Sequence, residues 1–394
     1  MKHYVDIFTI ALRLGLTSFG GPTAHLAYFH NEYVKQKRWL SEKSYADLVA
    51  LSQFLPGPAS SQVGIGIGLY RGGLFGGLLA FLGFTLPSVF LLIAFAMWFP
   101  TDLAFAAGLL KGLQLVAVAI VAHAIIGMSK SLAPDTSRQW IAFVAMATML
   151  LFPHPFIQIG IILIAACVGR LLFTQIIQQQ NRPGEHVPIS KTAGSVALVL
   201  FFFFLFAPPI ILAWKDIPIL SFFESFYQSG ALVFGGGHVV LPLLEQQFVS
   251  PTGLSGETFL AGYGATQAVP GPLFTFAAYL GAMLNGPIGG LFATFAMFLP
   301  AFLLIVGALP FWDLLRNNAH MQGAVNAMNA AVLGLLIAAF YNPIWTSSIT
   351  SASHFTIASL LFVLLQFQKW PSWKIVLLAA IIGALFLKSS LPFC

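Results

Sequence analysis

The chain has 394 residues, of which 58% are hydrophobic and only 8% are charged. A water-soluble globular protein carries roughly 25% charged residues, so this composition excludes a soluble enzyme, and its high apolar content also excludes a disordered chain. The net charge of +6 is typical of Lys and Arg on cytoplasmic loops, with an anionic substrate as the alternative explanation.

A membrane-spanning helix takes about 20 residues, so the composition predicts an all-α polytopic membrane protein with short loops. Arg13 interrupts the first apolar stretch, which we interpret as a retained helix and not as a cleaved signal peptide. The chain has two cysteines without metal-type spacing. We therefore expect no metal and no cofactor, and the absence of a long basic run predicts no nucleic-acid partner.

Six apolar runs precede a polar connector in the sequence. They cover residues 5–20 (continuing as an amphipathic stretch to 33), 45–69, 73–99, 103–128, 140–152 and 156–173. After the connector at 178–191 and an extra run at 194–214 come 222–244, 258–284, 287–310, 323–341, 354–367 and 373–387. We predict a first repeat at 1–177, a linker plus connecting helix at 178–214, and a second repeat at 215–394.

Matching motifs indicate that the two repeats arose by duplication. The Phe-Gly-Gly-Pro motif at 19–22 aligns with Phe-Gly-Gly-Gly at 234–237 at an offset of 215, and Leu-Ser at 40–41 aligns with 254–255 at an offset of 214. The Gln-x-x-Pro-Gly-Pro motif at 53–58 likewise aligns with 267–272. Order is kept over about 100 residues, which chance does not explain.

The number of runs predicts that the two repeats have inverted topology. Six crossings return the chain to its starting side, and the extra run at 194–214 then starts the second repeat on the opposite face. Loop charges agree, because residues 31–43 contain Lys35, Lys37, Arg38 and Lys43, whereas the matching loop at 245–257 contains no Lys or Arg.

Helix-breaking residues recur at matching places in the two repeats and predict the transport site. The glycine motif should form an elbow, after which a new helix exposes free N–H groups that attract an anion. Two prolines flanking a glycine also interrupt a helix, and unpaired backbone at membrane depth is tolerated only in protein or beside a wet cavity. The predicted substrate-binding residues of these motifs are Phe19, Gly20, Gly21, Pro22, Gln53, Pro56, Gly57, Pro58, Phe234, Gly235, Gly236, Gly237, Gln267, Pro270, Gly271 and Pro272.

Few ionisable residues lie within the apolar runs, and each is costly there unless paired or hydrated. Arg13 lies two turns before the first elbow, where its guanidinium suits a tetrahedral oxyanion; pairing with Asp6 or snorkelling is the alternative. His25 and His238 follow the two elbows and could donate to an anion, carry a proton, or fill the core. Proton-coupling candidates are Glu32, Glu224 and Glu245.

With these paired motifs, the chain resembles the chromate ion transporter family in its long, two-domain form. The resemblance covers essentially the whole chain and implies export of chromate, a tetrahedral dianion, across the bacterial inner membrane, driven by the proton-motive force. The motif positions of the family fall on Phe19, Gly20, Gly21 and Pro22, on 56–58, on Gly235 and Gly236, and on 270–272. Gly237 stands where the first repeat has Pro22, so the two elbows need not be equivalent.

The sequence is also compatible with other functions. The protein could transport another anion such as sulfate, or it could be a membrane-embedded enzyme that modifies lipids. The clustered acidic or histidine motifs of such enzymes are not visible, so we expect no enzymatic activity. The expected partners are a small inorganic oxyanion and the lipid bilayer, with a homodimer as the candidate assembly.

Overall fold

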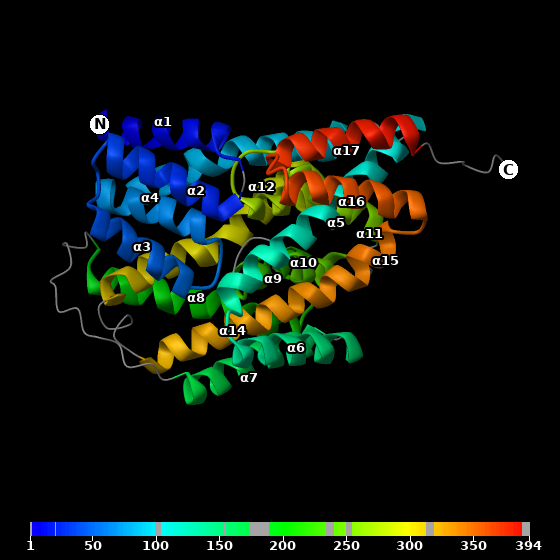
Figure 1. Ribbon diagram of the computed structural model, residues 1–394. Helices are drawn as coiled ribbons and strands as arrows, with labels where there is room; N and C mark the ends of the chain where they lie inside the picture. Colours follow the sequence, from blue (N-terminus) through cyan, green and yellow to red (C-terminus); the bar gives the residue numbers. More distant parts are fainter. Residues whose placement is uncertain are drawn as a thin grey trace.

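The computed structural model describes residues 2–19, 21–98, 104–152, 155–173, 189–233, 240–249, 254–312 and 319–387. These residues form helices joined by short connections, and no strand occurs among them (Figure 1). The expected all-α architecture is therefore confirmed.

The helices of the first half and the connecting helix follow the predicted runs closely. They are α1 (Lys2–Thr17), α2 (Gly21–Phe29), the π-helical segment η1 (His30–Gln36), α3 (Glu42–Phe54), α4 (Ala59–Trp98), α5 (Ala104–Leu132), α6 (Thr136–Leu151), α7 (Pro155–Leu172) and α8 (Lys191–Leu212).

The second half repeats this order, with additional short segments. Its helices are α9 (Pro218–Ala231), α10 (Val240–Phe248), α11 (Gly256–Thr266), η3 (Leu273–Thr275), α12 (Phe276–Ala308), η4 (Leu309–Phe311), α14 (Ala319–Ala339), η5 (Phe340–Trp345), α15 (Thr346–Ser348), α16 (Ala352–Gln366) and α17 (Ser372–Phe386).

Five helices of the described chain are long and apolar enough to cross a membrane. They occupy Ala59–Trp98, Ala107–Leu132, Lys191–Leu212, Leu273–Phe311 and Met321–Ser348. On α8, Phe202, Phe203 and Phe206 are each more than half exposed, which suits contact with lipid and not with water. The chain is thus a multi-pass membrane protein.

Each half begins with a hairpin, in which the chain runs along one short helix and comes back along a second. In the first half, α1 leads into α2 and η1, and the two arms are joined where Arg13 meets Glu32. In the second half, α9 and α10 form the matching hairpin, with the Phe226 and Phe248 rings 4.4 Å apart. Ser18, Phe19 and Gly21 therefore lie at the tip of the first elbow hairpin, and Leu232 and Val233 lie at the described end of the second.

A second hairpin follows in each half, with the Pro-Gly-Pro motif at its tip. Leu48 on α3 lies so close to Gly66 on α4 that a Cβ at Gly66 would clash with it, so the two arms run back along each other. In the second half, the Tyr279 hydroxyl donates to the Thr258 carbonyl at 3.1 Å. The apolar runs predicted at 45–69 and 258–284 therefore fold back at their proline motifs and do not cross as single helices.

The long helix α4 also reverses direction within its length, at Gly72 and Gly73, where the backbone is not helical. Gly68 and Gly76 touch through their backbones, although residues eight apart in a straight helix are about 12 Å apart. Helix α12 does the same at Asn285 and Gly286. These turns agree with the predicted boundaries between runs at 69–73 and 284–287.

The two Leu-Ser matches of the sequence mark the same helix start in both halves. The Ser41 hydroxyl accepts a hydrogen bond from the Ser44 amide at the start of α3, and the Ser255 hydroxyl accepts one from the Thr258 amide at the start of α11. A side-chain oxygen at this position satisfies one of the free amides of the first helical turn.

The two halves interlock through their long helices. Helices α6 and α7 of the first half pack on α14 of the second, and α16 and α17 of the second half pack on α5 of the first. In Figure 1, α6 and α7 accordingly lie beside α14, and α17 lies along α5. The repeat boundaries and the inverted orientation of the halves stay predictions.

Candidate functional site

The tips of the hairpins meet in pairs, each pair joining one half to the other. The Gly271 amide donates a 2.9 Å hydrogen bond to the Ser18 carbonyl, and the Gly57 amide donates a 2.6 Å bond to the Val233 carbonyl. We call the first contact the polar crossing and the second the apolar crossing. Ser18 and Val233 occupy matching positions of the predicted repeats, as do Gly57 and Gly271. The two contacts are therefore those expected if a two-fold axis relates the halves.

Glycine is required at both proline motifs because of its backbone torsion. Gly57 has a φ of +112° and Gly271 a φ of +104°, in the region where a side chain is strained. A Cβ at Gly271 would also lie 2.5 Å from the Ser88 hydroxyl. The motif thus turns each tip so that its amide reaches the opposite half.

The two crossings differ in polarity although they are related by the repeat. The residues after the first proline motif are Ser60, Ser61 and Gln62, and their counterparts at an offset of 214 are Phe274, Thr275 and Phe276. On α4, Thr85 and Ser88 correspond to Phe298 and Ala301 at an offset of 213. Hydroxyl groups therefore gather at the polar crossing, beside the elbow of the first half, more than at the apolar crossing.

His25 on α2 holds the polar crossing together. Its Nε2 lies 3.2 Å from the Ser18 carbonyl and its Nδ1 lies 3.3 Å from the Ser60 hydroxyl. A carbonyl can only accept, so Nε2 carries the proton and Nδ1 accepts from Ser60. The Ser18 carbonyl then accepts hydrogen bonds from both His25 and Gly271. Each ring nitrogen of His25, a predicted site residue, therefore has a partner within the protein.

Several buried polar atoms near the breakers have no hydrogen-bond partner in the described structure. They are Ser18 Oγ, Ser61 Oγ, Thr85 Oγ1, Gln62 Oε1 and Gln267 Nε2. Leaving such a group unsatisfied costs about 1–3 kcal/mol, so a set of them calls for an explanation. Three hydroxyls and one amide are donors, which suits a ligand rich in acceptor oxygens.

The first elbow is described except for Gly20. Gly21 and Pro22 open α2, and the Phe19 ring lies 5.9 Å from the ring of Trp373 on α17. Gly20 and the residues predicted at the second elbow, Phe234, Gly235, Gly236, Gly237 and His238, lie outside the described residues.

The proline motifs place their predicted residues differently in the two halves. The Pro56 carbonyl accepts from Gln62 Nε2 at 2.7 Å, and Pro58 accepts from the Gln62 amide at 2.9 Å. Pro270 and Pro272 are buried, as is Gln267, whereas Gln53 is exposed on α3. The two matched glutamines therefore have different environments.

Arg13 does not pair with Asp6, as the alternative interpretation had it, but with Glu32. Its Nη2 lies 2.5 Å from Glu32 Oε2, and the Arg13 side chain is 57% exposed while that of Glu32 is only 6% exposed. The second carboxylate oxygen of Glu32 is buried and has no hydrogen-bond partner in the described part of the chain. The Arg13 guanidinium thus pairs with a buried carboxylate while much of its own surface stays exposed.

The matching place in the second half carries no charge pair. Arg13 corresponds to Gln228 and Glu32 to Gln247 at an offset of 215. Gln228 Nε2 donates instead to Glu224 Oε1, one turn earlier on α9, at 2.8 Å. Glu245, the third acidic candidate, lies on α10 and lines a separate cavity.

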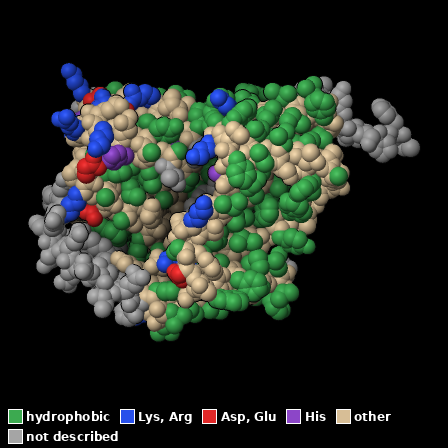
Figure 2. Space-filling view, in the orientation of Figure 1, with side chains coloured by type: hydrophobic (Ala, Val, Ile, Leu, Met, Phe, Trp, Pro, Cys, Tyr) green, Lys and Arg blue, Asp and Glu red, His purple; other side chains and the backbone are tan. Residues whose placement is uncertain are grey.

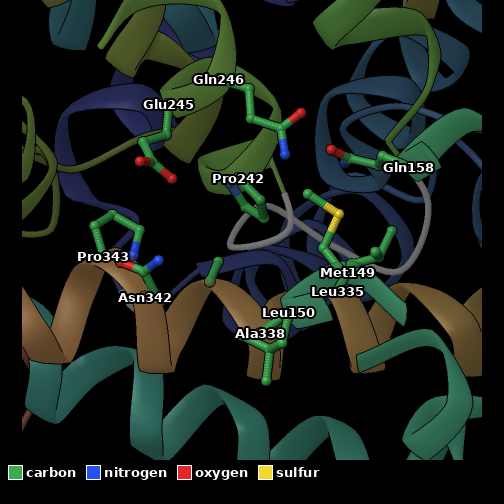
Figure 3. Close-up of a pocket in the computed structure, with 11 residues that line it drawn as sticks. Met149, Leu150, Gln158, Pro242, Glu245, Gln246, Leu335, Ala338, Asn342 and Pro343 are labelled. Carbon is green, nitrogen blue, oxygen red and sulfur yellow. The ribbon is translucent and has the colours of Figure 1, made fainter. Parts of the chain in front are cut away.

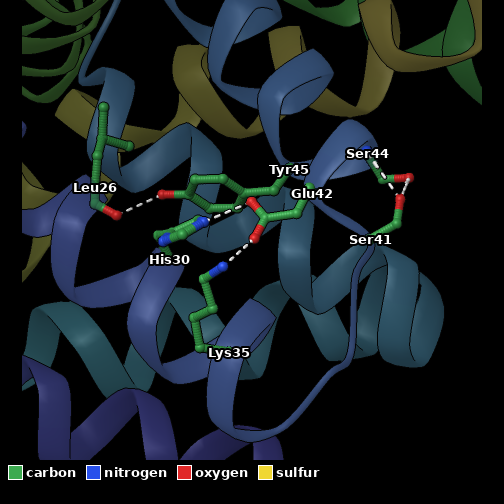
Figure 4. Close-up of polar contacts among 7 residues, drawn as sticks. All are labelled: Leu26, His30, Lys35, Ser41, Glu42, Ser44 and Tyr45. Atoms are coloured by element: carbon green, nitrogen blue, oxygen red, sulfur yellow. Dashed lines mark hydrogen bonds and ion pairs between the residues drawn. The ribbon is translucent and has the colours of Figure 1, made fainter.

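The segment η1 and the start of α3 form an ionic cluster at the protein surface. Glu42 lies 2.6 Å from Lys35 Nζ and 2.7 Å from His30 Nε2, while Tyr45 donates to the Leu26 carbonyl nearby (Figure 4). Hydrogen bonds from Lys35 and then from His30 hold the pKa of the Glu42 carboxyl below its usual range. Figure 2 shows Lys and Arg side chains gathered at this left end of the view, near the start of α1.

Sequence reasoning missed the hydroxyl residues of the polar crossing. The signal was available, because Ser-Ser-Gln at 60–62 interrupts an apolar helix directly after the proline motif, and the second half has Phe-Thr-Phe there. Neither the motif match nor the count of ionisable residues draws attention to uncharged donors such as Ser18 and Thr85.

Comparisons with known proteins identify the family of the chain. The family model described as "Chromate transporter" matches the chain twice, at residues 5–170 and 220–384. A transporter of Methanocaldococcus jannaschii that is described as uncharacterized is 27% identical, over 97% of this chain and 94% of its own.

Two further relatives are named for chromate. The chromate transport protein of Pseudomonas aeruginosa is 28% identical over 84% of this chain and 79% of its own. The chromate transport protein of Cupriavidus metallidurans is 24% identical over 94% of this chain and 90% of its own. No solved structure matches the chain. The two matches of the model cover both halves, and the chain belongs to the chromate transporter family.

Proposed function

We propose that the protein is a secondary active transporter that exports chromate across the bacterial inner membrane, coupled to the proton-motive force. The single observation that carries the proposal is the polar crossing, where buried donors of both halves lack partners among the residues that the structure describes. Chromate presents four oxygens that accept hydrogen bonds, so it can satisfy such a set. The names of the Pseudomonas and Cupriavidus relatives support chromate as the substrate.

The site uses uncharged donors close to the substrate and a charge farther away. Ser18, Ser61 and Thr85 would donate hydroxyl protons to the oxyanion, and Gln267 would donate from its amide. Arg13 lies five residues before Ser18, about 7.5 Å along the helix, and its open face would attract the dianion toward the elbow. The reciprocal contacts of the two tips would let small rotations of one half against the other alternate access, as in inverted-repeat transporters.

The experiment is flux of radiolabelled chromate and sulfate in proteoliposomes, with and without an imposed pH gradient. We expect chromate uptake that the gradient accelerates. Sulfate flux without chromate flux would assign the site to another oxyanion, and no flux of either would reject the transport proposal.

A homodimer is the proposed assembly. The mass of the purified protein in detergent tests this proposal.

Paired substitutions test the polar crossing itself. Thr85→Val removes a hydroxyl without changing the side-chain volume, and Ser18→Ala removes the second; both should reduce chromate flux without unfolding the protein. The matched control is Thr294→Val on α12, since the Thr294 hydroxyl bonds the Gly290 carbonyl of its own helix at 2.8 Å. Equal flux in Thr85→Val, Ser18→Ala and the control would place the substrate elsewhere.

A further inference from the structure

A cavity of about 220 Å³ lies away from the crossings, between segments of both halves. It is enclosed by α10, by the end of α6 and the start of α7, and by the end of α14 with η5. Its described lining is Met149, Leu150, Gln158, Pro242, Glu245, Gln246, Leu335, Ala338, Ala339, Asn342 and Pro343. The volume is enough for several water molecules.

Glu245 is the one ionisable side chain among these lining residues. Its carboxylate is half-buried and has no hydrogen-bond or ion-pair partner among the described residues. In Figure 3 it points toward Asn342 and Pro343 across the cavity. An isolated carboxylate within a membrane protein is costly unless a cation, a proton or water compensates for it.

The rest of the cavity wall also presents acceptors. Gln158 on α7 is 1% exposed, and its buried Oε1 has no partner among the described residues. In Figure 3 its amide extends toward that of Gln246. Pro343 has no N–H, so it cannot donate to the Ala339 carbonyl four residues earlier. The Asn342 side-chain oxygen accepts from the Thr346 hydroxyl at 3.2 Å.

Oxygen acceptors around one negative charge suit a small hard cation and repel an oxyanion. We propose that this cavity binds the coupling cation, a proton or Na⁺, with the Glu245 carboxylate as its charged ligand. That the bound cation drives chromate transport rests on the proposed function, whereas binding of the cation at Glu245 does not depend on that function.

The position of the cavity explains how cation binding can act on transport. Glu245 lies on α10, the returning arm of the second elbow hairpin, five residues after Val240 and so about 7.5 Å along the helix. Neutralising it favours closure of α10 against α7 and α14, because the charge no longer requires water between them. Since α7 belongs to the first half and α10 to the second, closure moves one half against the other.

The first test measures coupling with the full-length protein in proteoliposomes. Chromate flux is driven by an imposed proton or Na⁺ gradient, and exchange of labelled for unlabelled chromate is measured without a gradient. In Glu245→Gln we expect exchange to continue and acceleration by the gradient to be lost. The matched control is Asp216→Asn, which changes an exposed carboxylate between α8 and α9; a response of Glu245→Gln equal to that of the control overturns the proposal.

The second test needs no transport. Dicyclohexylcarbodiimide modifies protonated carboxyl groups in apolar surroundings, and mass spectrometry locates the modified residue. We expect modification at Glu245 that increases as the pH falls; suppression by Na⁺ identifies Na⁺ as a competing ligand, and insensitivity to Na⁺ identifies the proton alone. Absence of modification at every pH, with no ²²Na⁺ binding that Glu245→Gln removes, overturns the proposal even if chromate transport is observed.

The two tests also separate this inference from the proposed function. If the wild-type protein moves no chromate but Glu245 still shows the expected modification, the cation site stands and the substrate assignment fails. Gln158→Leu removes the unpartnered amide and keeps the charge, so it should weaken Na⁺ protection or shift the pH of modification. Unchanged behaviour of Gln158→Leu would remove Gln158 from the site.

Discussion

Arg13 on α1 and Glu32 on η1 form an ion pair of 2.5 Å that ties the two arms of the first elbow hairpin together. One partner is buried and the other is more than half exposed, so the pair joins the protein interior to the surface. The second half has Gln228 and Gln247 at the matching positions. The first half therefore carries an ion pair where the second half carries two neutral amides.

Replacing Arg13 separates its structural role from its role in transport. Arg13→Gln leaves the buried Glu32 carboxylate without its partner and should lower the free energy of unfolding by about 1–2 kcal/mol, less than for a fully buried pair because Arg13 is exposed. The double variant Arg13→Gln/Glu32→Gln, which copies the second half, should recover the thermal midpoint in detergent. If Arg13 attracts the oxyanion, both variants transport little chromate; wild-type flux in the double variant would leave Arg13 a purely structural role.

The glycines of the crossings should tolerate no side chain. Gly271→Ala combines a strained backbone torsion of about 1–2 kcal/mol with a contact against Ser88, while Gly57→Ala meets Gln62 Nε2 at 3.1 Å. We therefore expect both to destabilise the protein, Gly271→Ala more strongly. Thermal unfolding followed by size-exclusion chromatography measures the difference.

The matched control for these variants is Gly127→Ala on α5, where a Cβ meets nothing within 4 Å. A helical glycine replaced by alanine changes stability by no more than about 1 kcal/mol. Equal midpoints for Gly271→Ala and Gly127→Ala would contradict the proposed constraint at the polar crossing.

Close helix contact between the halves should depend on small residues of α5 and α17. A Cβ on Gly112 would collide with the Ala379 backbone, and one on Gly383 would collide with Gly108. Gly112→Val should therefore push the two helices apart, lower the thermal midpoint and reduce the yield of folded protein. Gly160→Val on α7, where a Cβ has open space, serves as the comparison, and similar losses in both variants would indicate a general effect of valine in these helices.

The ionic cluster around Glu42 predicts a pH dependence of stability. Because Lys35 and His30 lower the folded-state pKa of Glu42, its contribution is present above the usual carboxyl pKa and is lost as the pH falls through the lowered value. The midpoint of the wild type should therefore fall more steeply than that of Glu42→Gln on acidification below about pH 4.5. Parallel curves for the two proteins would show that the cluster does not stabilise the fold.

Much of the fold was predictable from the sequence, because its signals are local. Scarcity of charge requires a membrane environment, and the apolar runs set most helix positions. Proline and glycine interrupt a helix wherever they occur, so the breakers at 19–22 and 56–58 and their repeats were located without a structure. Ser41 and Ser255 cap helices through atoms only three residues away.

Only the tertiary structure decided which of these local features meet. That the breakers are tips of hairpins, that Gly271 contacts Ser18 and Gly57 contacts Val233, and that Arg13 pairs with Glu32 all depend on how helices pack. The polarity of one crossing arises from hydroxyl residues between Ser18 and Ser88, and the cavity around Glu245 is lined by three separate segments, at 149–158, 242–246 and 335–343. Composition and local sterics fix where a chain can bend, but contacts between distant segments depend on the packing of the whole fold.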